Sequence, residues 1–125
     1  RRNNLVILYK NLIIRLYVKQ MRFKYINEES KLCIKLNEEI DVESCKTLRT
    51  IVDGYILKYN PNMCEIDMEN VTFMDSSGIG FIAGRSNLSK MLNCELVIKK
   101  PSASVKKLLD MSAIMKDVKV VWYEQ

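Results

Sequence analysis

The stretch from residue 63 to residue 92, MCEIDMENVTFMDSSGIGFIAGRSNLSKML, contains a strand pattern, a loop and a helix pattern in direct succession. In its first six residues the apolar Cys64, Ile66 and Met68 alternate with acidic residues, which indicates a strand with one buried face. The polar Asp-Ser-Ser-Gly sequence at 75–78 then opens a helix that runs to about residue 92. A strand followed directly by a helix is one half of a crossover unit, so the stretch predicts a parallel pairing with another strand.

The same alternation of strands and helices extends in both directions from this unit. The expected strands are 23–26, 32–36, 63–68, 95–99 and 118–122, and the expected helices are 43–59, 76–92 and one that begins at Ser102 as N-cap. The apolar face expected of the helix over 43–59 consists of Cys45, Leu48, Val52, Tyr55 and Tyr59. Strands separated by helices of this length predict an α/β fold, with a mixed, largely parallel sheet of about five strands and helices packed on it.

The first twenty residues differ in charge from the rest of the chain. Residues 1–20 contain five basic residues and no acidic one, whereas residues 21–125 contain 15 basic and 15 acidic residues. We therefore expect one domain over 21–125, preceded by a basic apolar extension over 1–20, which is interpreted as an upstream segment that comes either from a misassigned start site or from an added sequence. The extension is too short and too charged to span a bilayer, so no membrane partner is expected, although a basic interfacial helix is the alternative. The neutral domain has no basic footprint for nucleic acid.

The chain has no histidine and no closely paired cysteines. Without histidine it cannot form a Ser-His-Asp or Cys-His catalytic arrangement, nor a histidine-ligated metal site. The four cysteines, Cys33, Cys45, Cys64 and Cys94, lie in apolar stretches and are interpreted as reduced thiols in a cytoplasmic protein. We expect no metal, no cofactor and no enzymatic activity.

The loop over residues 71–80 is the most informative part of the chain for function. Its serines lie at the start of a helix, where unpaired backbone N–H groups and the helix dipole favour a negative charge such as a phosphate. Gly78 and Gly80 leave room for another surface to approach the backbone. The simpler alternative is that Asp75 or Ser76 only caps the helix.

The spacing Gly78-x-Gly80-x-x-Ala83 also fits a loose dinucleotide-binding pattern. The acidic residue expected about 20 positions further on is missing, because Lys99 and Lys100 occupy that region. A nucleotide-binding function is therefore disfavoured.

Three blocks of the sequence resemble one known family. The block over 73–80, followed by Gly84-Arg85, closely resembles the signature of STAS-domain anti-sigma-factor antagonists of the sporulation type. The blocks over 36–41 and 105–112 are similar to two further segments of that family, in the same order. The resemblance covers residues 21–125 and implies the STAS fold.

The resemblance also implies a switch. In this family the unphosphorylated protein binds an anti-sigma factor that is also a serine kinase, and this binding releases the sigma factor. The kinase phosphorylates the first serine of the Asp-Ser-Ser-Gly motif, here Ser76, which turns binding off, and a PP2C-type phosphatase reverses the modification. The residues expected on the partner surface are Asp41, Asp75, Ser77, Gly78, Ile79 and Gly80. The alternative within the same fold is a non-switching STAS subunit of a lipid-transport or scaffold complex.

Overall fold

The computed structural model describes residues 4–10, 12, 21–37 and 39–122. Its centre is a five-stranded sheet in which the order of the strands is the order of the chain, β1-β2-β3-β4-β5. The strands are β1 (Arg22–Ile26), β2 (Lys31–Lys35), β3 (Met63–Asp67), β4 (Glu95–Lys99) and β5 (Lys119–Val121). The α-helices that connect the parallel strands are α2 (Val42–Tyr59), α3 (Ser76–Met91) and α4 (Ala103–Asp110), and the short 3-10 turns are η1 (Asn27–Glu29) and η2 (Ala113–Asp117).

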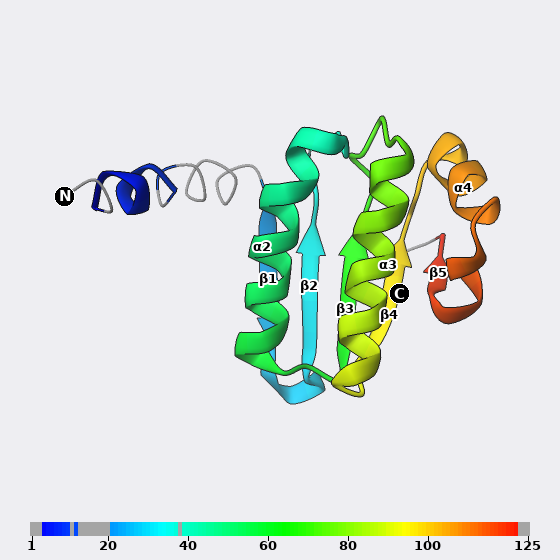
Figure 1. The fold of residues 1–125 in the computed structure, drawn as a ribbon. Coiled ribbons are helices and arrows are strands. Elements are labelled where there is room, and N and C mark those ends of the chain that lie inside the picture. The colour runs from blue at the N-terminus through cyan, green and yellow to red at the C-terminus, as the bar shows by residue number, and fades with distance from the viewer. Residues whose placement is uncertain (1–3, 11, 13–20, 38, 123–125) are drawn as a thin grey trace.

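The sheet is mixed, as the sequence predicts. β1 and β2 form an antiparallel hairpin in which Phe23 lies opposite Ile34, whereas β2, β3, β4 and β5 are parallel. Parallel neighbours require a crossover, and α2, α3 and α4 each provide one. Helices α2 and α3 cover one face of the sheet, and α4 lies near β5 (Figure 1). The α/β expectation is confirmed.

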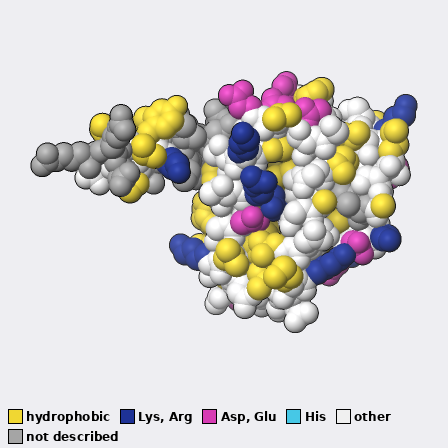
Figure 2. Space-filling model, in the orientation of Figure 1, with side chains coloured by type: hydrophobic (Ala, Val, Ile, Leu, Met, Phe, Trp, Pro, Cys, Tyr) yellow, Lys and Arg dark blue, Asp and Glu magenta, His cyan; other side chains and the backbone are white. Residues whose placement is uncertain are grey.

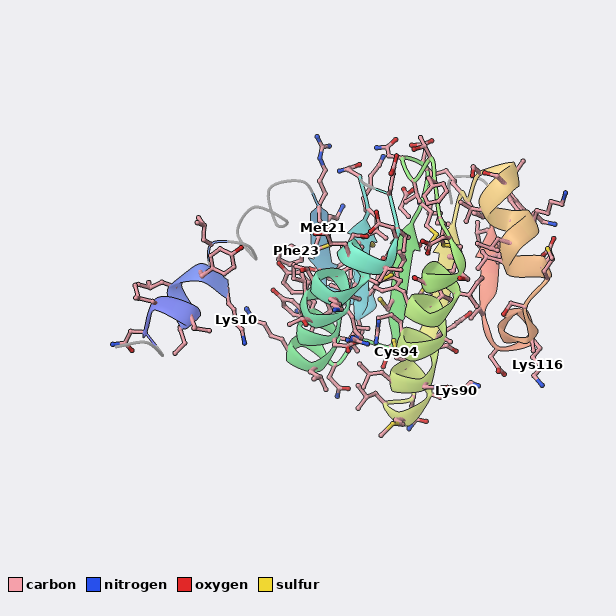
Figure 3. All side chains as sticks on the ribbon, turned by 45° about the horizontal axis from the view of Figure 1, so that its top comes forward. Lys10, Met21, Phe23, Lys90, Cys94 and Lys116 are labelled. Carbon is pink, nitrogen blue, oxygen red and sulfur yellow. The ribbon has the colours of Figure 1, made fainter. Side chains whose placement is uncertain are left out.

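The hydrophobic core lies between this face of the sheet and the helices. It is formed by alternate residues of the central strands, which are fully or almost fully buried: Leu32, Ile34, Cys64, Ile66, Leu96 and Ile98. At the β1 edge, the Phe23 ring stacks on Tyr55 of α2 with ring centres 4.1 Å apart, and Figure 3 shows Phe23 beside that helix. The core therefore fixes the position of α2 and α3 on this face of the sheet.

The buried face of α2 is wider than the sequence pattern predicts. Ile51 and Ile56 are buried, whereas Cys45, Tyr55 and Tyr59 are only half-buried. The reason is that α2 packs both on the sheet and on α3, so apolar residues outside the predicted stripe also find neighbours.

Charged side chains on the opposite face of the sheet neutralise one another. Glu65 is only 6% exposed, but Lys31 and Lys99 place their ammonium groups 3.1 and 3.3 Å from its carboxylate. The alternation predicted one buried face for this strand, but Glu65 on the other face is buried as well, and its burial is compensated by two cations from neighbouring strands.

Residues 4–10 and 12 are helical, and this helix, which carries Lys10, lies away from the sheet (Figures 1 and 3) but lines a pocket together with Lys46, Thr47 and Thr50 of α2. Its large apolar side chains are mostly exposed. Within the described residues no helix combines the length and apolar character needed to cross a bilayer. Residues 13–20 lie outside the described residues, so the division of the chain at residue 20 stays a prediction.

Candidate functional site

The candidate site lies where α2 and α3 begin, at the edge of the sheet where the parallel strands end (Figure 1). The two loops that lead into these helices are joined by an isolated parallel bridge between Ile40 and Met74. The amide of Ile40 donates to the Phe73 carbonyl at 3.0 Å, and the amide of Asp75 donates to the Ile40 carbonyl at 3.2 Å. Two segments more than thirty residues apart in the sequence are therefore held as one unit.

Asp41 is the N-cap of α2. Its carboxylate accepts from the Ser44 amide at 2.9 Å, and the Ser44 hydroxyl accepts from the Asp41 amide at 3.1 Å, which completes a capping box. The hydrogen bonds from Ser44 lower the pKa of Asp41 below its ordinary value. Asp41 is therefore ionised at neutral pH, and it lies in the loop bridged to the Asp75 loop.

Asp75 is the N-cap of α3, because its carboxylate accepts from the Ser77 amide at 2.8 Å. Ser76 is the first residue of the helix and is exposed. In the described part of the chain the Ser76 side chain takes part in no hydrogen bond or ion pair. Of the two capping candidates, the structure selects Asp75 and leaves the Ser76 hydroxyl free toward solvent.

The two glycines of the motif have different environments. Gly78 is buried, and a methyl group at its α-carbon would overlap the side chain of Met74 and lie 3.3 Å from Ile40. Gly80 is exposed, and a methyl group there would meet nothing within 4 Å. Gly78 thus allows the bridged loops to pack on α3, while Gly80 leaves bare backbone at the surface.

The six residues expected on the partner surface are therefore brought together, but not equally presented. Asp41, Asp75, Ser77 and Ile79 are half-buried, Gly80 is exposed and Gly78 is buried. Gly78 can influence a partner only through the loops that pack on it.

A groove beside the motif contains residues that the sequence analysis missed. It has a volume of about 310 Å³ and lies between the first halves of α2 and α3. Its lining residues are Val42, Cys45, Lys46, Arg49, Ser77, Gly80 and Phe81. Val42 is 64% exposed, and Phe73 in the adjoining loop is 48% exposed, so both apolar side chains are available at the surface beside the groove. Figure 2 shows basic side chains over α2 and acidic side chains gathered along the edge where α2 and α3 begin.

An ion pair close to this groove links the two helices. Arg85 of α3 is 4% exposed, and its Nε lies 2.7 Å from the Asp53 carboxylate on α2. The Arg85 guanidinium also lies 5.1 Å from the centre of the Phe81 ring, which forms part of the groove. Because one partner is nearly fully buried, loss of either charge would destabilise the helix pair.

The described residues contain no group of three or more His, Cys, Asp or Glu side chains arranged to hold a metal ion. All four cysteines are free thiols, of which Cys64 and Cys94 are buried and the other two half-buried. Burial raises the pKa of each thiol, so none of them is an activated nucleophile.

Comparison with known proteins identifies relatives of this chain. The model of the STAS domain family matches residues 23–122. An anti-sigma F factor antagonist of Paenibacillus polymyxa is 32% identical over 85 residues, which cover 68% of this chain and 73% of the relative. An anti-sigma F factor antagonist of Lysinibacillus sphaericus is 25% identical over 81 residues, covering 65% and 69%.

Two solved structures share the fold. The anti-sigma factor antagonist SpoIIAA in its unphosphorylated form matches with a TM-score of 0.64 and 18% identity, over 84% of this chain and 89% of that one. The Bacillus cell fate determinant SpoIIAA in the phosphorylated form matches with a TM-score of 0.62 and 20% identity, over 80% and 89%.

Proposed function

The chain belongs to the STAS domain family, and from that premise we propose that it is an anti-sigma factor antagonist that is switched off by phosphorylation of Ser76. In its unphosphorylated form it binds an anti-sigma factor with serine kinase activity and thereby releases a sigma factor. A PP2C-type phosphatase restores the active form. The protein acts in the cytoplasm, in a sporulation pathway, as a binding switch and not as an enzyme.

The relatives support the general role, because the similar proteins of Paenibacillus polymyxa and Lysinibacillus sphaericus are both named anti-sigma F factor antagonist. SpoIIAA, which shares the fold, exists in an unphosphorylated and a phosphorylated form. A switch by phosphorylation is therefore compatible with this fold.

The observation that carries the proposal is the position of Ser76. Its hydroxyl is exposed at the first residue of α3, and the helix cap next to it is provided by Asp75. A substrate hydroxyl needs only to be reachable, so the absence of histidine is no obstacle. The positive end of the helix dipole can accept a phosphate without loss of the fold.

The same position explains how a phosphate would abolish binding. Phosphorylation adds about −1.5 to −2 charges and three acceptor oxygens. These would stand beside the Asp75 carboxylate and near the loop that carries the ionised Asp41. Like charges brought together in an interface cost several kcal/mol, which lowers affinity by about a hundredfold or more.

The test is intact-mass spectrometry after incubation with ATP and the anti-sigma kinase encoded nearest to this gene. We expect one added phosphate on the wild type, one on Ser77→Ala and none on Ser76→Ala. Ser77 is the matched control because it is the neighbouring serine. No phosphate on the wild type with an active kinase would contradict the switch and favour a non-switching STAS subunit of a lipid-transport or scaffold complex.

A further inference from the structure

The groove between α2 and α3 has a charge of its own. Two of its lining residues, Lys46 and Arg49, are basic and none is acidic. They are three residues apart on α2, so they project on the same side of the helix, and both are exposed. Within the described residues, no ion pair involves either side chain.

The nearest candidate for neutralising Arg49 is already engaged. Asp53 follows Arg49 by one helical turn, but its carboxylate is bound to Arg85 at 2.7 Å. The groove therefore presents two cations that form no ion pair within the described residues, while the adjoining edge presents the carboxylates of Asp41 and Asp75.

The shape of the groove allows another chain to come close. Gly80 exposes bare helix backbone and has open space at its α-carbon, and the buried Phe81 is one of the residues that line the groove. At the end nearest the helix starts, Val42 offers an exposed apolar side chain. A peptide segment with carboxylates for the cations and a small apolar residue for Val42 matches these features.

We propose that this groove receives an acidic segment of the anti-sigma factor, with its carboxylates paired to Lys46 and Arg49. The proposal rests on the proposed function and adds the chemistry of the partner. Basic groups of the partner face the acidic edge, and acidic groups of the partner face the basic groove. Because the reversed arrangement would bring like charges together, only one orientation of docking is favourable. Ser77 lines the groove and directly follows Ser76, so a phosphate on Ser76 would add negative charge within one helical turn of the groove.

The first test is isothermal titration calorimetry of the full chain with the full-length, unmodified anti-sigma kinase. Arg49→Glu is expected to weaken binding at least tenfold, because it replaces an attraction by a repulsion. Lys107→Glu, the matched control, makes the same change of charge at an exposed position on α4 and is expected to stay within twofold of the wild type. Thermal unfolding of both variants checks that the fold is retained.

The second test identifies the charge of the occupant directly. A zero-length carbodiimide reagent joins a lysine ammonium to a carboxylate in contact with it, and mass spectrometry of the complex is expected to show Lys46 joined to an Asp or Glu of the kinase. The inference would be overturned if the wild type and Arg49→Glu bound the kinase equally well and no such cross-link formed at Lys46. That result would leave the proposed function intact. A wild type that does not bind the kinase would instead refute the proposed function.

Discussion

Gly78→Ala tests whether the packing of α3 against the bridged loops builds the site. The added methyl group would overlap the Met74 side chain, and Met74 forms the bridge with Ile40 that joins the two loops. Gly80→Ala, two residues further along the same helix, adds the same methyl group in open space. The two variants therefore differ mainly in whether the added methyl group meets the Met74 side chain.

The expected magnitude follows from two opposing effects. Replacing glycine by alanine in a helix stabilises the fold by about 0.5–1 kcal/mol, because the unfolded chain loses conformational freedom. Overfilling a well-packed site costs about 1–3 kcal/mol. Gly80→Ala should thus stabilise the protein by about 0.5–1 kcal/mol, and Gly78→Ala should be about 1–3 kcal/mol less stable than Gly80→Ala.

The assay is urea unfolding followed by circular dichroism, repeated in a Met74→Ala background. Removing the Met74 side chain makes a cavity that itself costs about 2–5 kcal/mol. In that background the overlap with Met74 is removed and only the 3.3 Å contact with Ile40 remains, so Gly78→Ala should cost clearly less than in the wild-type background. If Gly78→Ala were equally destabilising in both backgrounds, Met74 would not be the contact that limits position 78, and the reasoning would be wrong.

Three further outcomes follow from the site and its surroundings. Ser76→Asp should lose affinity for the anti-sigma kinase by about a hundredfold in calorimetry while its unfolding curve stays that of a folded protein, and unchanged affinity would contradict the charge argument. The lowered pKa of Asp41 means that its contribution to stability is present above its ordinary pKa of 3.8 and is lost as pH falls through the lower folded pKa. Asp41→Asn, which keeps a capping side chain, should therefore show a smaller loss of stability between about pH 5 and pH 2 than the wild type, and identical pH profiles would exclude this role. Cys64 should not react with a thiol reagent at pH 8 until the protein unfolds, because burial raises its pKa, and rapid labelling in the native state would show that the site opens.

The elements that local patterns determine were predictable. β4 spans the predicted residues 95–99, and Ser102 caps α4 by accepting from the Val105 amide at 3.3 Å. The last strand is shorter than predicted, because β5 ends at Val121 and leaves Trp122 outside it, 44% exposed. Periodicity and capping depend on residues within one turn of each other, so a single sequence carries them.

The properties that arise between distant segments were not predictable. The role of Gly78 depends on Met74 and on Ile40, which lies 38 positions earlier in the chain. Lys46 and Arg49 become neighbours of Ser77 only when α2 and α3 pack side by side. The motif indicated a candidate site from the sequence, but the opposite charges on the two sides of that site depend on the tertiary structure.

The strand order of the sheet has a consequence for how the molecule is made. Because each strand pairs with the one synthesised just before it, every crossover unit can add to an edge that already exists. When β4 has left the ribosome, the four strands and two helices that surround Ser76 can already be assembled. The last crossover, through α4 to β5, then completes the sheet after the candidate site has taken shape.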